Sequence, residues 1–200
     1  IFFEIFYVNH MLSTVVFLSS ALFAPTMRLP SGRSISLHGN GPPVLFSTGL
    51  FGSMPHWIYS DVFRRMTPNV TLVVLNGPDP LIGDRIDEIA DALQVDQMGF
   101  FSHSSTDARI LESPRIRAAV LCDPVVLPRL SLPMQLSGMD VVNDIPFLVV
   151  RAGQSYDPIE TGIPDFLGPN LPDEKTTTLT FDRMGHADLL DDTWADVGTS

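Results

Sequence analysis

The sequence predicts an α/β fold: a mostly parallel, doubly wound sheet with an antiparallel hairpin at its N-terminal end. The first observation is that short apolar runs alternate with amphipathic segments from residue 44 onward, which is typical of strands joined by helical crossovers. The second is size, because 200 residues with 44% hydrophobic and 18% charged residues suit one globular domain. A chain of this length buries roughly 70% of its unfolded surface. We therefore expect one sheet with helices on both faces.

The hairpin is predicted over residues 26–37. Two short strand-like arms flank Pro30, Ser31 and Gly32, and these residue types favour tight turns. Residues 39–43 form a loop before the first buried strand. The hairpin would add antiparallel strands at one edge of the sheet.

Short, mainly apolar runs predict the strands. The run at residues 44–47 is unbroken, as expected of a strand that is covered on both faces, whereas Asp96 and Gln97 interrupt the run at residues 95–101. The runs lie at residues 44–47, 71–75, 95–101, 118–122, 147–150 and 177–181. Two long irregular segments, residues 125–146 and 154–175, follow strands of this set. We expect them at the carboxyl ends of the strands, where open α/β sheets bind their ligands.

Helical spacing of apolar residues predicts the crossovers. Residues 55–66 place apolar side chains every four positions. The clearest helix covers residues 84–93, where apolar residues fall at positions i, i+3, i+4 and i+7 and acidic residues face away. A shorter helix is expected over residues 105–112.

Charge and cysteine content exclude several functional classes. The net charge is −11 and the isoelectric point is near 4.6, which argues against binding to nucleic acid or to an anionic membrane surface. Cys122 is the only cysteine, so neither an intrachain disulfide nor a cysteine-based metal site can form. Its apolar surroundings in the sequence predict a small buried residue.

Residues 1–25 differ from the rest and are interpreted as an apolar leader or targeting segment, with the domain over residues 26–200. This segment carries one charge, Glu4, and its apolar run ends in small residues, as secretory signals do. Residues 21–25 also resemble the junction of plastid presequences in algae with secondary plastids. Localisation to the plastid or the secretory pathway follows if the segment is a presequence, and membrane association is expected through residues 1–25 only.

A candidate nucleophile, Ser104, lies just past the apolar run at residues 95–101 and among small polar residues. A tight turn between a strand and a helix lifts such a hydroxyl above the edge of the sheet. Asp123 ends a later strand, and His186 lies in the loop after the last strand. The order Ser, Asp, His is the one that the nucleophile, acid and base take in α/β-hydrolases.

Two points of this site stay open. Asp157 follows the next strand and is the alternative acid, since many hydrolases draw their acid from that position. The oxyanion hole requires two backbone N–H groups. Ser105 is expected to supply one, and Leu50, with Phe51 as its near alternative, the other.

Within the α/β-hydrolase superfamily, the chain resembles the chlorophyllases. Four parts of the sequence carry the resemblance: residues 43–60, 101–105, 119–125 and 185–192. The most specific are Asp-Pro-Val in the third and Gly-His-Ala-Asp-Leu-Leu-Asp-Asp in the fourth. In that family the acid follows the sixth strand, which favours Asp123 over Asp157. The chain departs from the family at Thr48, where His is common, at Ser102 and Thr106, which replace the elbow glycines, and at its C-terminal helix, which is expected to be truncated.

The resemblance implies a serine carboxylic-ester hydrolase that cleaves the phytyl ester of chlorophyll-type pigments. The implied substrate is a large, apolar small-molecule ester, with no organic cofactor and no metal. The substituted elbow motivates an alternative from another class. In that alternative, the chain is a non-catalytic module of the same fold that binds an apolar ligand or partner.

Overall fold

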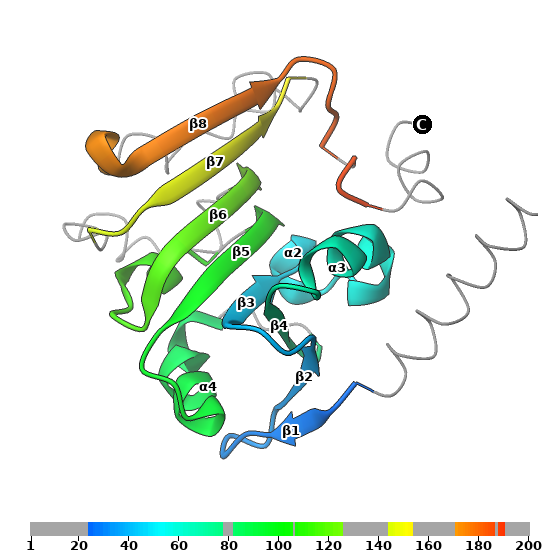
Figure 1. The fold of residues 1–200 in the computed structure, drawn as a ribbon, viewed down its shortest axis with the longest axis vertical. Coiled ribbons are helices and arrows are strands. Elements are labelled where there is room, and N and C mark those ends of the chain that lie inside the picture. The colour runs from blue at the N-terminus through cyan, green and yellow to red at the C-terminus, as the bar shows by residue number, and fades with distance from the viewer. Residues whose placement is uncertain are drawn as a thin grey trace, which may run out of the picture.

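The computed structural model describes residues 24–77, 82–105, 107–125, 144–153, 171–186 and 188–190. In this part of the chain, eight strands form one sheet in the order β1-β2-β4-β3-β5-β6-β7-β8 (Figure 1). The strands are β1 Thr26–Arg28, β2 Ser34–His38, β3 Pro43–Ser47, β4 Thr71–Leu75, β5 Met98–Ser105, β6 Ile116–Val125, β7 Phe147–Ala152 and β8 Thr176–Phe181. The predicted fold class is therefore confirmed.

Strand direction divides the sheet into two parts. β1 pairs with β2, and β2 with β4, in antiparallel fashion, whereas all pairs from β4 to β8 are parallel. The predicted hairpin is confirmed at the edge of the sheet, where the Leu29 N–H donates to the Arg33 carbonyl at 2.8 Å. Gly32 takes a φ of 85° in this turn, a conformation that glycine adopts without steric cost. The parallel strands β5 to β8 all end at one edge (Figure 1).

The helices are short and lie between the strands. They are α2 Gly49–Gly52, η1 His56–Tyr59, α3 Ser60–Met66, η2 Ile82–Arg85, α4 Ile86–Leu93, η3 Ala108–Glu112 and η6 Asp173–Lys175. The single helix predicted over residues 55–66 is divided into η1, a 3₁₀ turn, and α3, an α-helix. The helix predicted over residues 84–93 is present as α4, with η2 leading into it.

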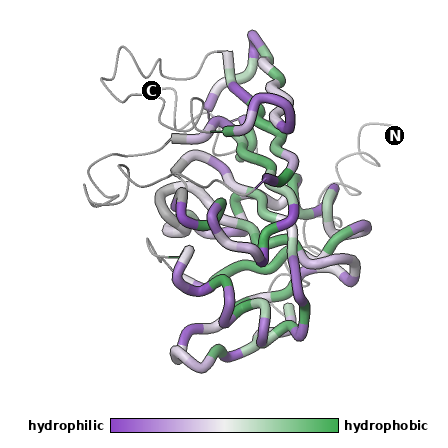
Figure 2. The backbone as a smooth tube through the Cα atoms, turned by 90° about the vertical axis from the view of Figure 1, so that its left-hand side faces the viewer, coloured by the Kyte–Doolittle hydropathy of each residue, from purple (hydrophilic) through white to green (hydrophobic). Residues whose placement is uncertain are grey.

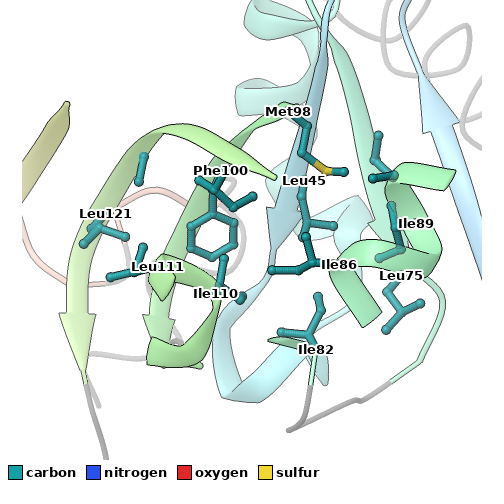
Figure 3. Close-up of a cluster of buried hydrophobic side chains, with 14 of the residues drawn as sticks. Leu45, Leu75, Ile82, Ile86, Ile89, Met98, Phe100, Ile110, Leu111 and Leu121 are labelled. Carbon is teal, nitrogen blue, oxygen red and sulfur yellow. The ribbon is translucent and has the colours of Figure 1, made fainter. Parts of the chain in front are cut away.

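Apolar side chains fill both faces of the sheet. Adjacent residues of β3 point to opposite faces, so Leu45 belongs to one buried cluster and Phe46 to the other. Ile86 and Ile89 of α4 pack in the Leu45 cluster (Figure 3). Burial on both faces explains why the strand residues of the central sheet read as continuous apolar runs. Hydrophobic and hydrophilic stretches alternate along the chain (Figure 2).

The cluster around Phe46 contains four aromatic side chains and holds η1 and α3 against the sheet. The Phe46 ring lies 5.3 Å from Tyr59 and 5.0 Å from Phe63, both edge to face, and 5.1 Å from Phe101, stacked. Aromatic pairs in these arrangements contribute about 0.5–1.5 kcal/mol beyond the area that they bury. Tyr59 is thereby fixed beneath the carboxyl end of β5.

Two predicted boundaries around β5 are wrong. The strand predicted over residues 95–101 begins at Met98, because Gln94 ends α4 in the left-handed conformation and the chain turns through residues 95–97. The strand also continues to Ser105, so no helix starts there. The helix predicted over residues 105–112 is reduced to η3, which the Asp107 side chain caps by accepting from the Arg109 N–H.

Several expectations lie outside the described residues. These are the leader segment up to residue 23, most of the two long irregular segments, and the C-terminal helix beyond residue 190. Within the described ranges, none of the helices has the length and apolar character needed to cross a membrane.

The central strands should carry most of the stability. Replacing Leu45, which is fully buried (0% exposed), by Ala is expected to lower the free energy of unfolding by about 3 kcal/mol, because it removes buried methyl groups and leaves a cavity. Leu179 in β8 is 43% exposed and offers a matched control. Leu179→Ala should cost under about 1 kcal/mol. Urea unfolding of both variants measures the difference, and equal losses would contradict a core centred on β3.

Candidate active site

Ser104 sits where β5 departs from the ladder of the sheet. Its φ is 59°, in the left-handed region that residues other than glycine rarely adopt. The pairing of β5 with β6 shifts register between His103 and Ser105, so the chain bends at this residue. A strained turn of this kind presents the side chain at the carboxyl edge of the sheet, as the sequence predicts.

His186 lies in the loop after β8, which returns to the end of β5 (Figure 1). Its Nε2 atom is 2.9 Å from the Ser104 Oγ atom. A compact turn shapes the loop, because the Gly185 N–H donates to the Asp188 carboxylate at 2.8 Å and the Asp188 N–H donates to the Gly185 carbonyl at 3.2 Å. The imidazole is about one quarter exposed, so it is accessible from outside.

Asp123 holds the other side of the imidazole. Its Oδ2 atom lies 2.5 Å from the His186 Nδ1 atom, and its Oδ1 atom accepts a hydrogen bond from the Ala152 N–H at 3.2 Å. The residue is only 6% exposed, and its φ of 42° aims the carboxylate away from the regular direction of β6. The structure thus brings together Ser104, His186 and Asp123, whereas Asp157 lies outside the described residues.

The directions of these hydrogen bonds follow from the chemistry of the groups. An ionised carboxylate only accepts, so His186 donates its Nδ1 proton to Asp123. The Nε2 atom of the neutral ring then carries a lone pair, which accepts from the Ser104 hydroxyl. A base within hydrogen-bond reach of the proton that it removes, oriented by a third group, meets the geometric requirement for activating a serine.

The predicted oxyanion donors lie next to this arrangement. Leu50 belongs to α2, which starts at Gly49 directly after β3, and Ser105 follows Ser104 in β5. A Cβ atom placed on Gly49 would lie 3.6 Å from the Ser104 Cβ and only 2.8 Å from the Met54 sulfur. Glycine at this position therefore avoids a clash with Met54, while the contact with Ser104 would be an ordinary van der Waals contact.

The segment after the bend is anchored to η2. The buried Asp107 carboxylate accepts from the Gly83 N–H at 2.9 Å and pairs with the Arg109 guanidinium at 2.9 Å. Arg109 also reaches Asp84 at 2.8 Å. These contacts join η3, which follows the end of β5, to η2, which precedes α4. Thr106 lies outside the described residues.

The sequence assigns no role to two side chains at this edge, His103 and Tyr59. The structure places the His103 ring against Tyr59 and His186. Burial lowers the pKa of His103 to about 4 and raises the pKa of Tyr59 to about 12, so both are neutral at pH 7. The sequence feature that could have identified His103 is its position directly before Ser104. Tyr59 has no comparable feature.

Cys122 is buried beside Asp123, and burial raises the pKa of its thiol to about 12. A thiol that stays protonated is a poor nucleophile, which agrees with the buried role expected from the sequence. Among the side chains that the structure describes, no group of three or more His, Cys, Asp or Glu is placed to hold a metal ion.

An open pocket of about 620 Å³ borders the loop that carries His186. Its lining consists of Thr180, Phe181, Asp182, Arg183, Met184 and Asp188. Phe181, half exposed at the end of β8, gives this pocket an apolar wall.

A second pair of histidines lies at the end of β2, apart from Ser104 and Asp123. The His38 ring lies 5.1 Å from both His56 and Phe63. In the described part of the chain, the buried Nε2 atom of His38 has no hydrogen-bond partner. Burial, followed by repulsion from His56, lowers the pKa of His38 to about 4. This imidazole therefore stays neutral in the folded chain.

Comparisons with known proteins come from structure alone, since no protein-family profile and no curated protein matches the sequence. The fold is similar to that of an N-formylmaleamic acid deformylase from Pseudomonas putida (12% identity, TM-score 0.59, 88% of this chain and 98% of that one). An alpha/beta fold family hydrolase from Bacillus anthracis matches at 10% identity and a TM-score of 0.55 over 86% and 96% of the two chains. An esterase domain from Rhodothermus marinus matches at 14% identity and a TM-score of 0.56 over 87% and 94%. These likenesses establish the fold.

Acid should destabilise the protein through His38. Its folded pKa is below the unfolded value of 6.5, so its contribution to stability is present above pH 6.5 and is lost as the pH falls towards 4. The loss is at most about 3 kcal/mol. In His38→Leu, the free energy of unfolding should depend less steeply on pH in this window, with the remaining slope partly due to His103. Denaturant unfolding from pH 7.5 to 4 measures this slope, and identical slopes for the variant and the wild type would refute the assignment.

Proposed function

We propose that this chain, which has the α/β-hydrolase fold, is a serine carboxylic-ester hydrolase. Ser104 is the nucleophile, His186 the general base and Asp123 the acid that orients the base. The observation that carries this proposal is the continuous hydrogen-bonded arrangement of the three side chains, with 2.9 Å between Ser104 Oγ and His186 Nε2 and 2.5 Å between His186 Nδ1 and Asp123 Oδ2.

The reaction proceeds in two stages. In the first, the Ser104 Oγ atom bonds to the ester carbonyl carbon while His186 Nε2 takes the hydroxyl proton. Collapse of the tetrahedral intermediate breaks the bond to the alcohol oxygen, which leaves with the proton from His186. In the second stage, His186 removes a proton from water, the resulting hydroxide attacks the acyl-enzyme, and Ser104 recovers its proton as the acid leaves.

Asp123 acts on the charge that forms in both stages. When His186 becomes an imidazolium, the buried carboxylate stabilises it and keeps the Nδ1 proton in place. The Ala152 N–H bond to the second oxygen of Asp123 restrains rotation of the carboxylate. Because Ala152 ends β7, the adjacent strand supports the acid.

The oxyanion of each tetrahedral intermediate is proposed to bind the N–H groups of Ser105 and Leu50, with Phe51 as the alternative to Leu50. Backbone donors that are fixed before the reaction stabilise developing charge without reorganisation. The position of Gly49 next to the Ser104 side chain supports this location. The first N–H groups of a helix also lack acceptors within that helix.

The proposed substrate class rests on the similar structures, the resemblance in sequence and the surroundings of the site. The similar structures include an esterase domain and a deformylase, which supports hydrolysis of a carboxylic acid derivative. The chlorophyllase resemblance over residues 119–125 and 185–192 supports the phytyl ester of a chlorophyll-type pigment. Phe181, half exposed in the pocket that borders the loop of the base, suits an apolar part of an ester, and the net charge of −11 disfavours a nucleic acid.

The alternative is a non-catalytic module that binds an apolar ligand or partner. Ser102 and Thr106 favour it, because they replace the two glycines that usually relieve crowding at the elbow. The two proposals differ in one measurable property, covalent reaction at Ser104.

A fluorophosphonate probe is expected to label the wild-type protein at Ser104 and to leave Ser104→Ala unlabelled. Ester turnover should fall by about 10⁴ or more in this variant, because the nucleophile is removed while binding is retained. Mass spectrometry of the labelled peptide identifies the site. A folded wild-type protein that binds an ester but is neither labelled nor active would favour the non-catalytic module.

Asp123→Asn tests the acid. The amide lets His186 adopt the wrong tautomer, and kcat is expected to fall by about 10³–10⁴, by analogy with the same change in serine proteases. Asp157→Asn is the matched control and should keep kcat within a few-fold of the wild type. Steady-state hydrolysis of a nitrophenyl ester measures both variants. The opposite pattern would assign the acid to Asp157.

The substrate is tested by giving the purified protein a chlorophyll and a short-chain nitrophenyl ester in parallel. Release of phytol with slow cleavage of the short ester supports a pigment esterase. Rapid cleavage of the short ester alone would limit the proposal to a general carboxylesterase.

A further inference from the structure

A buried chain of hydrogen bonds links three parts of the candidate site. It starts at the Gly49 N–H, which lies 2.9 Å from the Tyr59 hydroxyl oxygen. That oxygen is 2.8 Å from the His103 Nδ1 atom, and the His103 Nε2 atom is 2.8 Å from the main-chain carbonyl oxygen of His186. The chain therefore connects the loop of the proposed oxyanion hole, the strand of the nucleophile and the backbone of the base.

The chemistry of its two ends fixes the direction of every bond. The Gly49 N–H can only donate, and the His186 carbonyl can only accept. His103 must therefore carry its proton on Nε2 and donate it to His186. In a neutral ring this leaves a lone pair on Nδ1, which accepts from the Tyr59 hydroxyl, while the Tyr59 oxygen accepts from Gly49.

The protonation state of His103 agrees with this scheme. The residue is 2% exposed, and burial lowers its pKa to about 4, so the ring is neutral at pH 7. The titratable groups that face it are Tyr59, His186, at 4.9 Å between ring centres, and Asp123. A charged His103 would lose the acceptor on Nδ1 and would repel the imidazolium that His186 becomes during the reaction.

Tyr59 and His103, whose side chains form this series of hydrogen bonds, are rigidly held. Tyr59 is fully buried, and its ring packs edge to face on Phe46 at 5.3 Å and on His103 at 5.6 Å. η1 supplies Tyr59 from one face of the sheet, and β5 supplies His103. Neither side chain can rotate without breaking a buried hydrogen bond and leaving a buried polar group without a partner, which is unfavourable.

We propose that Tyr59 and His103 are positioning residues that fasten the His186 loop and the Gly49 loop to the strand carrying Ser104. His103 holds the backbone of the base, and Tyr59 holds both His103 and the start of the oxyanion loop. The proposal rests on the proposed function for its effect on turnover. The hydrogen bonds themselves are independent of that function.

The geometry of the reaction explains why a rigid fastening matters. The described hydrogen bonds of the His186 loop include its own turn at Gly185, the contact of the imidazole with Asp123, and the bond from His103. Of these, the His103 bond is the one that joins the loop backbone to β5. A misplacement of about 1 Å between reacting groups can reduce turnover by about 10².

The test uses the full chain with Tyr59→Phe, His103→Leu and His103→Gln. Tyr59→Phe removes only the hydroxyl, and His103→Gln keeps an amide that can donate to the His186 carbonyl. Ser36→Ala is the control, because it removes a buried hydroxyl that donates to Asn76 at 2.9 Å without contact with this chain of bonds. Unfolding free energies, kcat and KM for a nitrophenyl ester, and the nitrogen and proton NMR signals of His103 and His186 are measured.

We expect the His103 proton on Nε2 in the wild type. Tyr59→Phe should lower kcat about tenfold, with KM changed less than about twofold, and should broaden the proton signal of the His186–Asp123 hydrogen bond. His103→Leu should lower kcat further, and His103→Gln should recover part of that loss. Ser36→Ala should lose stability but keep kcat and the His186 signal.

The proposal is overturned if the His103 proton lies on Nδ1. It is also overturned if Tyr59→Phe leaves the His186 signal unchanged, or if kcat follows stability equally in all variants, control included. A wild type without esterase activity refutes the proposed function, whereas the two NMR results still decide whether Tyr59 and His103 position His186.

Discussion

The hydrogen bond between Ser104 and His186 depends on one property of the sheet, the common direction of β5 to β8. Parallel strands place their carboxyl ends along one edge, so residues 82 positions apart in the sequence come within 2.9 Å. β6 brings Asp123 to the same edge, and β7 supplies the N–H of Ala152 that restrains it. Each of the three side chains therefore stands on a different strand or on the loop that follows one, and the packing of the sheet determines their separation.

This arrangement stores strain that the core must support. Ser104 and Asp123 both have positive φ, and such residues cost of order 1–3 kcal/mol each. They lie in central strands, because β5 and β6 have partners on both sides and contribute side chains to both apolar clusters. Strained residues persist only where their surroundings leave no cheaper conformation. The anchoring of Asp107 to Gly83 and Arg109 gives that support just beyond the bend.

The sequence is sufficient to predict which side chains form the candidate site, but not the exact bounds of the strands and helices that carry them. The alternation of apolar runs and helical stripes predicts a mostly parallel sheet, and Ser104, Asp123 and His186 each follow or end a predicted strand of it, so they are expected at its carboxyl edge. The predicted boundaries of β5 are less accurate. Gln94 ends α4 in the left-handed conformation, so the strand begins later than predicted, and it continues through the bend at Ser104 to Ser105, where an α-helix was expected. The contact of Tyr59 with His103 could not be predicted, since it depends on the depth at which η1 packs on Phe46. Asp157 and the leader segment stay predictions.

Ser102, the first substituted position of the elbow, is compatible with this packing. Glycine is common two residues before the nucleophile because the neighbouring strand approaches closely there. In this chain Ser102 takes that position, fully buried, and its partner in the parallel ladder of β3 is Ser47, which is also buried. Two small side chains in register occupy little more space than glycine paired with a larger residue. The serine is thus accommodated by the strand beside it, and the bend that it precedes retains the positive φ at Ser104 that the proposed chemistry requires.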